Sequence, residues 1–258
     1  MIPKIGIVVP TIGQRPQYLP QTLRSIRESG DCFILLVGRA GFDASEFLEN
    51  GLIDRYLDEQ VASLPGKINF GFSQLPTEVE YINWVGDDDL LAPNSMLVAL
   101  ERIEQSDKPV LVFGGCQYID KNGRQLWNQK SGHWAVPLLR FGPQLIPQPA
   151  SLYRRKVFER IGGLSTLFDY AFDFDLFLRL SKEGRCVFIP ATLASFRWHS
   201  ESLSVKNRHK SVSEASAVRR SHLPRHLKSI SLLWEVPVRL ATLWAGNVLN
   251  STLKKKSS

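Results

Sequence analysis

The amino-acid sequence predicts an α/β protein with a mostly parallel, Rossmann-like central sheet and helices on both faces. Two observations carry this prediction. Apolar segments of strand length alternate with segments of helical character over residues 1–115, the order that builds a parallel sheet. Polar loops follow the first, second and fourth apolar segments. Parallel sheets bind their ligands at this end of the strands, so the three loops are expected to meet at one cleft.

The expected strands are apolar runs bounded by proline, glycine or polar residues. They are residues 4–10, 32–37, 52–57, 80–85 and 109–119. The expected helices lie between and after these strands. They are residues 17–28, 44–49, 66–74 and 94–105. Pro93 is expected to begin the last of these helices, because proline is favoured at the first helical position.

Helical spacing returns in the segment FDYAFDFDLFLRLSKEG, residues 168–184. Phe174, Phe177 and Leu178 mark one face of this helix, and Gly184 is expected to end it. Asp173 and Asp175 stand at its N-terminal end. Two interpretations are open for these carboxylates. They complement the helix dipole, or one of them is a general base directed into the cleft.

Composition indicates a cytoplasmic protein. The chain of 258 residues has three cysteines without metal-ligand spacing, which is typical of a reducing compartment. It has no run of 18 apolar residues and no recognisable secretory signal, so a spanning helix is not expected. The net charge of +7 divides into +9 over residues 206–258 and −2 over the rest. The basic segment lacks the motifs of nucleic-acid-binding domains, so no nucleic acid is expected as a partner.

The basic C-terminal extension, residues 205–258, begins with a segment that is either a linker or an exposed helix. Pro237 is expected to begin a second helix. The apolar residues on an approximate stripe of that helix are Trp234, Leu240, Leu243, Trp244 and Val248. This helix either packs on the main domain or lies peripherally on an anionic membrane at its inner face.

Three consecutive aspartates, Asp87, Asp88 and Asp89, follow the fourth expected strand in the stretch WVGDDDLLAP. Neighbouring carboxylates repel one another. Mg²⁺ and Mn²⁺ bind carboxylate and phosphate oxygens, and such a cation removes the repulsion. A solvated loop is the alternative, and a helix cap is disfavoured because Pro93 places the cap at Ala92. The triplet therefore favours a site for Mn²⁺ or Mg²⁺.

Three other residues have two interpretations each. His199 follows the apolar run of residues 186–196 and is either a packed side chain or a metal ligand. Trp134 lies in an aromatic and proline-rich segment, residues 129–149. Trp134 and Trp198 are either core residues or surfaces that stack on a sugar.

These segments together resemble the family 2 glycosyltransferases, which have the GT-A fold, over about residues 4–204. GIVVPTIGQRPQYLPQTLRSI is similar to the opening strand and helix of the family, and YINWVGDDDLLAP to its metal-binding DxD segment. QPASLYRRKVFERIGGLSTLFDYAFDFDLFLRL resembles the acceptor-side block, and FRWHSESLS the closing segment with its histidine. All four motifs occur in the family's order, which makes the resemblance specific.

The resemblance implies a GT-A catalytic domain over residues 1–204 and a helical extension over 205–258. The nucleotide-sugar-binding half is expected at 1–115 and the acceptor-side half at 116–204. The implied reaction is an inverting transfer of a sugar from a nucleoside-diphosphate sugar, in the first place a UDP-sugar. The implied acceptor is a hydroxyl of a glycan or of a lipid-linked molecule.

The resemblance also implies a role for individual residues. Asp173 is expected to be the general base. The expected donor-binding residues are Pro10, Thr11, Arg39, Lys67, Asp87 and Asp88. The expected metal ligands are Asp88, Asp89 and His199. The expected acceptor contacts are Trp134, Asp175 and Trp198.

The chain departs from the family at the end of the second expected strand. The family usually has an acidic pair there, V-D-D-G-S, whereas this chain has Val37-Gly38-Arg39-Ala40-Gly41. Arg39 is expected to contact phosphate or another nucleotide surface. Two rival functions stay open. One is a nucleotidyltransferase, although TIGQRPQ lacks a glycine-rich phosphate loop, and the other is a catalytically silent protein that binds sugar nucleotides.

Overall fold

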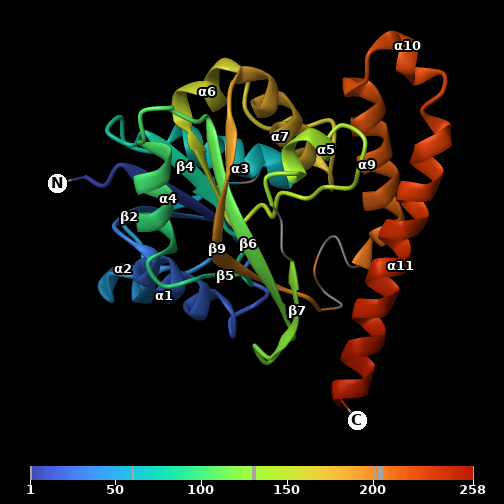
Figure 1. Ribbon diagram of the computed structural model, residues 1–258. Helices are drawn as coiled ribbons and strands as arrows, with labels where there is room; N and C mark the ends of the chain where they lie inside the picture. The colour runs from blue at the N-terminus through green and yellow to red at the C-terminus, as the bar shows by residue number, and fades with distance from the viewer. Residues whose placement is uncertain (1, 60, 130–131, 200–201, 203–205, 258) are drawn as a thin grey trace.

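The computed structural model describes residues 2–59, 61–129, 132–199, 202 and 206–257. A nine-stranded sheet forms its centre, in the order β3-β2-β1-β4-β8-β6-β9-β5, with β7 paired to β6 (Figure 1). The strands are β1 Ile5–Pro10, β2 Cys32–Gly38, β3 Arg55–Asp58, β4 Tyr81–Trp84, β5 Leu90–Leu91, β6 Leu111–Ile119, β7 Gln125–Gln129, β8 Ser151–Arg154 and β9 Cys186–Arg197.

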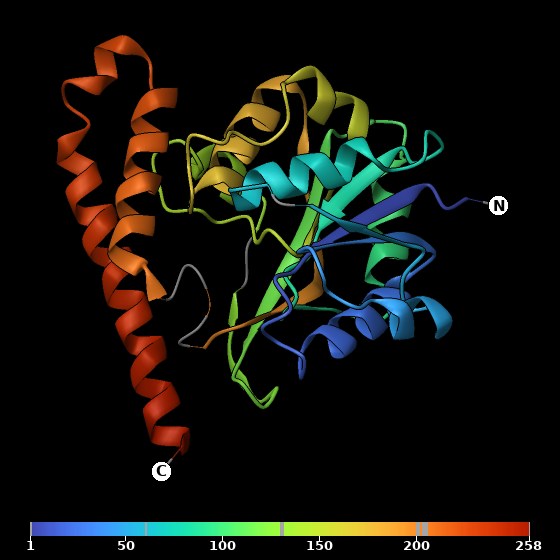
Figure 2. The ribbon, with the colours of Figure 1, turned by 180° about the vertical axis from the view of Figure 1, so that it is seen from behind.

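Helices cover both faces of this sheet (Figures 1 and 2). The helices of the described residues are α1 Leu19–Ser29, α2 Ser45–Glu49, α3 Leu64–Ser73, α4 Ser95–Ile103, α5 Ala135–Leu138, α6 Arg155–Arg160, α7 Phe172–Glu183, α9 Arg208–His222, α10 Arg225–Lys228 and α11 Leu232–Ser257. The α/β fold with a mostly parallel sheet and a C-terminal helical tail is confirmed.

Strands β1 to β4 are parallel to one another. β1 lies between β2 and β4, with Ile5 opposite Cys32 on one side and Tyr81 on the other. β8 then joins β4 to β6 in antiparallel orientation. The long strand β9 runs parallel to β6 and antiparallel to the short strand β5.

Alternate side chains of the buried strands fill two separate cores. Val8 and Leu35 face the side that α3, α6 and α7 cover. Ile7 and Ile34 face the side that α1 and α4 cover. Strands that are buried on both faces read as continuous apolar runs, which is why the sequence alone located them.

The entry to α4 differs from the expectation that Pro93 begins the helix. The helix begins at Ser95, and Asn94 precedes it in the left-handed region at a φ of 59°. The backbone N–H of Asn94 donates to the carbonyl of Glu28 at 3.0 Å, and that of Ser95 donates to Ala92 at 3.0 Å. A turn tied to the end of α1 therefore delays the start of the helix.

The C-terminal extension forms two helices, α9 and α11, that run side by side next to the sheet and are joined through α10 (Figures 1 and 2). Val218 of α9 belongs to one of the two cores, so this segment packs on the main domain. The expectation that Pro237 begins the last helix was wrong, since α11 starts at Leu232. The domain boundary expected at residues 204 and 205 lies outside the described residues.

None of the helices within the described ranges is long and apolar enough to cross a membrane.

Candidate active site

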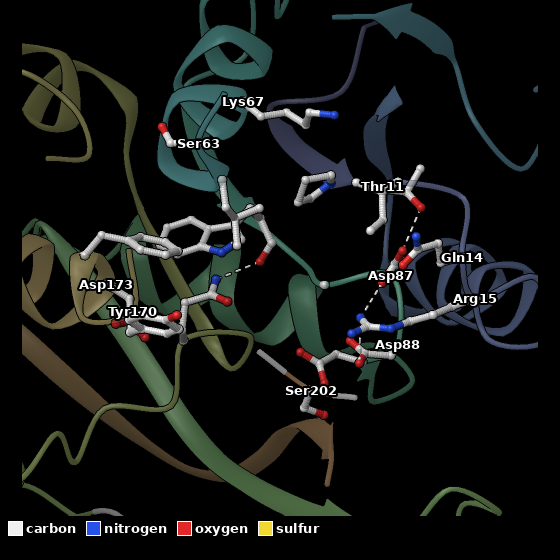
Figure 3. Close-up of a pocket in the computed structure, with 18 of the residues that line it drawn as sticks. Thr11, Gln14, Arg15, Ser63, Lys67, Asp87, Asp88, Tyr170, Asp173 and Ser202 are labelled. Carbon is white, nitrogen blue, oxygen red and sulfur yellow. Dashed lines mark hydrogen bonds and ion pairs between the residues drawn. The ribbon is translucent and has the colours of Figure 1, made fainter. Parts of the chain in front are cut away.

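A cavity of about 1020 Å³ lies at the carboxyl ends of β1 and β4, where open α/β sheets bind their ligands. Loops after the two strands form one wall, and the segment leading into α7 forms the opposite one (Figure 3). The polar residues that line the cavity are Thr11, Gln14, Arg15, Ser63, Lys67, Asp87, Asp88, Asp89, Gln148, Tyr170, Asp173, Ser202, Lys206 and Asn207. Seven expected site residues meet here: Pro10, Thr11, Lys67, Asp87, Asp88, Asp89 and Asp173.

Arg15 compensates the charge of the first two aspartates. Its Nη1 atom lies 2.7 Å from Oδ1 of Asp87 and 2.9 Å from Oδ2 of Asp88. The Thr11 hydroxyl donates to Oδ2 of Asp87 at 2.6 Å. Burial lowers the pKa of Arg15, but the charges of Asp88 and Asp87 outweigh it and raise that pKa. The guanidinium is therefore a permanent cation held between two carboxylates.

Asp89 is buried, like its two neighbours. Burial, and then the charge of Asp88, raise its pKa well above the ordinary value. Its Oδ1 accepts from the backbone N–H of Arg197 at 3.0 Å. A Cβ on Gly86 would lie 3.0 Å from Oδ1 of Asp88 and 3.2 Å from Oδ2 of Asp89. Both carboxylates therefore pack closely over Gly86, which brings them near each other.

Residues at and just after the end of β9 contact the aspartate loop, residues 87–89. Nε2 of His199 lies 2.7 Å from Oδ2 of Asp88, and the imidazole packs beside the ring of Tyr18. The buried guanidinium of Arg197 donates to the backbone carbonyl of Asp88 at 2.9 Å. It also stands over the ring of Tyr18, 4.4 Å from the centroid. His199 thus contacts Asp88, one of the residues that were expected to bind the metal.

The donor chemistry of this group fits a hard divalent cation. Asp88 and Asp89 supply carboxylate oxygens and His199 an imidazole nitrogen, all of which are ligands for Mn²⁺ and acceptable ones for Mg²⁺. Within the described residues, no three His, Cys, Asp or Glu side chains are already arranged to hold a metal. Arg15 and His199 both contact Oδ2 of Asp88, so a cation at this oxygen requires Arg15 to move away.

Asp173 lies across the cavity from the aspartates, on the first turn of α7 (Figure 3). The Gln144 amide donates to its Oδ2 at 2.7 Å. The backbone N–H of Phe174 donates to its Oδ1 at 2.7 Å. Burial raises the pKa of Asp173, and these two hydrogen bonds oppose the rise. An enclosed carboxylate with a raised pKa is suited to accept a proton.

Two expected donor residues lie at the end of β2 and on α3. The Lys67 ammonium is buried and donates to the carbonyl of Gly38 at 3.0 Å, and burial lowers its pKa. Arg39 is exposed and is not part of the cavity lining. Its carbonyl accepts from the hydroxyl of Tyr56 at 3.0 Å. The structure therefore brings Lys67, but not Arg39, to the cavity.

The three expected acceptor residues do not line the cavity. Asp175 is engaged with Arg179 at 2.7 Å and with His222 at 2.8 Å. Burial would raise the pKa of Asp175, but these two partners lower it overall. Trp198 is buried and lies under the guanidinium of Arg208. Trp134 is 50% exposed at the start of α5.

Several residues that line the cavity, or that contact a residue lining it, were not predicted from the sequence. Arg15 could have been predicted, because it is a basic residue in the loop after β1, which was expected to face the aspartates. Gln144 could not have been predicted, because it lies in an irregular segment and its partner, Asp173, comes 29 positions later. Lys206 and Asn207 line the cavity from the segment before α9, at the start of the expected C-terminal extension.

Comparisons with known proteins point to one class of enzyme. The chain matches no family model. It is 25% identical over 162 residues to an uncharacterized glycosyltransferase of Rickettsia bellii, covering 59% of this chain and 23% of that protein. It is 24% identical over 193 residues to an uncharacterized glycosyltransferase of Rickettsia typhi, covering 70% of this chain and 57% of the relative. The chain thus spans less than two thirds of both relatives.

Solved structures of glycosyltransferases share the fold. A mannosyltransferase of Pyrobaculum calidifontis in complex with GDP-Man and Mn²⁺ superposes with a TM-score of 0.64 at 15% identity, covering 99% of this chain and 75% of that one. TarS of S. aureus in complex with UDP superposes with a TM-score of 0.62 at 13% identity, covering 89% of this chain and 69% of that one. The chain therefore has the GT-A type fold of these glycosyltransferases.

Arg15→Gln tests whether the guanidinium stabilises the buried aspartates. The variant leaves Asp87 and Asp88 without their cation, and uncompensated buried charge typically costs about 3 kcal/mol of unfolding free energy. Urea denaturation at pH 7.5 in the presence of a chelator measures this loss. Arg15→Lys keeps the charge and serves as the matched control. Equal stability of wild type and Arg15→Gln would contradict this account of the site.

Proposed function

We propose that the protein is an inverting glycosyltransferase of family 2 type that uses a nucleoside-diphosphate sugar. The observation that carries this proposal is the cavity itself, with Asp87, Asp88 and Asp89 on one wall and Asp173 on the other. The names of both relatives support a glycosyltransferase. The neighbours with bound UDP or GDP-Man support a nucleotide-sugar donor.

The donor is proposed to bind along the ends of β1 and β4. Pro10 and Thr11 would flank the nucleoside, and Asp87 would contact the ribose. Two cationic side chains of the lining, Arg15 and Lys206, suit the diphosphate, because guanidinium and ammonium groups bind phosphate strongly. A UDP-sugar is the first candidate. Arg39, in place of the usual acidic pair, leaves a GDP-sugar as the second.

A divalent cation, Mn²⁺ or Mg²⁺, is proposed to bind at Asp88 and Asp89, with His199 beside them. When bound, such a cation stabilises the negative charge that develops on the departing diphosphate. Arg15 forms ion pairs with Asp87 and Asp88, and in this proposal its guanidinium turns from these carboxylates to the diphosphate when the cation binds. The Mn²⁺ in the mannosyltransferase neighbour supports this assignment.

Asp173 is proposed to be the general base. The acceptor hydroxyl attacks the anomeric carbon, the bond from that carbon to the diphosphate breaks, and the hydroxyl proton moves to the carboxylate. Attack from the face opposite the diphosphate inverts the anomeric configuration. Gln144 holds the carboxylate at 2.7 Å, which fixes its orientation toward the cavity. Positioned bases of this kind contribute about 10²–10⁴-fold to rates.

The acceptor is proposed to be a glycan or a lipid-linked hydroxyl that enters beside α7. Trp134 is retained as a candidate acceptor contact, since half of its surface is free. Asp175 and Trp198 are engaged by residues of the extension and are not assigned this role. In this proposal residues 1–204 are the catalytic domain, with 1–115 binding the donor and 116–204 the acceptor.

Calorimetric titration with UDP, GDP and dTDP, with and without Mn²⁺, tests the donor site. Binding of one nucleotide that strengthens with Mn²⁺ is expected, and Asp88→Asn with Asp89→Asn should remove the Mn²⁺ dependence. Free pyrophosphate as a reaction product would point instead to a nucleotidyltransferase. Binding without any transfer would indicate a silent sugar-nucleotide-binding protein. Absence of binding by every nucleotide would overturn the proposal.

Asp173→Asn tests the general base. The amide cannot accept the proton but fills the same space, so turnover should fall by about 10²–10⁴-fold. The nucleotide dissociation constant should stay within about twofold, because the residue lies across the cavity from the donor side. Asp169→Asn, the same substitution at an exposed position four residues earlier, is the control. Wild-type turnover by Asp173→Asn would refute the assignment.

We further propose that α11 contacts the surface of an anionic membrane. Its outer side carries Leu233, Val236, Leu240, Trp244 and Val248 at helical spacing, and each of them is exposed. Leu233 and Trp244 are 77% and 69% exposed. The opposite side, with Glu235, packs toward α9. The extension carries a formal charge of +9, so an apolar surface beside cationic groups fits anionic lipid.

The double substitution Leu240→Gln with Trp244→Gln should weaken binding to phosphatidylglycerol vesicles by about tenfold or more, because two apolar side chains no longer enter the lipid. Co-sedimentation with phosphatidylglycerol and with phosphatidylcholine vesicles measures this change. Leu167→Gln, at an exposed leucine outside the extension, is the control. Failure of the wild type to bind anionic vesicles, or self-association through α11 in solution, would contradict the membrane contact.

A further inference from the structure

Helix α9 contacts the segment that leads into α7 through Glu214. Its Oε2 accepts from the backbone N–H groups of Tyr170 at 2.7 Å and Ala171 at 3.1 Å. Its Oε1 accepts from the N–H of Asp169 at 3.3 Å. One carboxylate of the extension therefore binds three consecutive N–H groups immediately before α7. Asp173 follows two residues after the last of them.

The position of Glu214 matches what the start of a helix requires. N–H groups at a helix N-terminus lack intrahelical partners, and a negative charge is favoured there. Ala171, the residue at the N-cap of α7, makes no side-chain capping bond of its own. Glu214 supplies, from another helix, a negative charge and an acceptor for the N–H groups of Asp169, Tyr170 and Ala171, which directly precede the first turn of α7. The path of the chain into α7 thus depends on α9.

Arg219 of α9 contacts the segment that carries Gln144, the side-chain partner of Asp173. Its Nη1 donates to the carbonyl of Gly142 at 3.0 Å, two residues before Gln144, whose amide binds Asp173. The guanidinium also stands 5.8 Å from the ring centroid of Phe174. Glu235 of α11 fixes Arg219 through two bonds of 2.8 Å. The extension therefore holds both the helix that carries Asp173 and the segment that carries its hydrogen-bond donor.

We propose that Glu214 and Arg219 are positioning residues for the Asp173 carboxylate, and that the C-terminal extension thereby completes the acceptor side of the site. This inference rests on the proposed function, in which Asp173 is the general base. Misplacement of a reacting group by about 1 Å can reduce a rate by about 10²-fold. Glu214 and Arg219 then affect turnover without contacting the donor, which is proposed to bind at the opposite wall.

The test compares Glu214→Ala, Glu214→Gln and the control Ser213→Ala, which alters an exposed neighbour on the same helix. Glu214→Ala should lower kcat about ten- to 100-fold, with the nucleotide dissociation constant within twofold of wild type. Glu214→Gln keeps an oxygen that accepts from the same N–H groups, so it should recover much of the lost kcat. Melting temperatures of all variants show which of them are folded.

The pH profile separates positioning from simple stabilisation. If Asp173 is displaced and loses the hydrogen bond from Gln144, the neutral form of its carboxyl group is favoured. The pKa of Asp173 should therefore rise. Because the base must be ionised to act, the acid limb of the kcat profile should move to higher pH in Glu214→Ala and in Arg219→Lys. The limb should stay unmoved in Ser213→Ala.

Unchanged kcat and pH profile in folded Glu214→Ala would overturn the inference. A parallel loss of kcat, donor affinity and folded fraction, without recovery in Glu214→Gln, would also overturn it and leave a purely structural role. Absence of transfer by the wild type is a distinct result, because it overturns the proposed function itself. Wild-type turnover by the Asp173→Asn variant would refute the role of Asp173 as the general base. It would not bear on the contacts that α9 makes.

Discussion

The concentration of three carboxylates at the end of β4 is the constraint on which the rest of the site depends. Asp87 and Asp89 are enclosed enough for burial to raise the pKa of both, so the loop needs compensation from several directions. Arg15 provides charge from the loop after β1. Arg197 provides backbone and side-chain donors from β9. The loop therefore contacts the loop after β1 and the end of β9, two segments that lie far apart in the sequence.

The sequence was sufficient to predict the strands that are buried on both faces and the loops at their carboxyl ends. Such strands are continuous apolar runs, and parallel topology places their ends at one edge. That reasoning located Thr11, Asp87, Asp88 and Asp89 in one cavity. Asp173 was found because a carboxylate at the start of an amphipathic helix is visible in the sequence, although its pairing with the cavity rested on the family resemblance.

The remaining features depend on contacts between distant segments, which no local pattern records. The strand β5 exists because Leu90 and Leu91 pair with Ser195 and Ala194. Asp175 has the same residue type and nearly the same position as Asp173, yet His222 and Arg179 engage it. Arg179 of α7 and His222 of α9 thus bind Asp175, whereas Asp173 lines the cavity. The sequence left open whether the extension packs on the main domain, and the contacts of α9 with the segment before α7 join it to the site.

The place of β9 in the sheet has a consequence for the order in which the chain folds. β9 lies between β6 and β5, and its end supplies the N–H and guanidinium that hold the aspartate loop. During synthesis, the ribosome releases the residues of β1 to β6 well before β9 exists. Pairings between segments so distant form slowly, and unpaired edges expose a growing chain to aggregation. The sheet of the nascent protein is therefore incomplete until β9 emerges. Chaperones that bind the unpaired edge of β6 before that point would reduce aggregation.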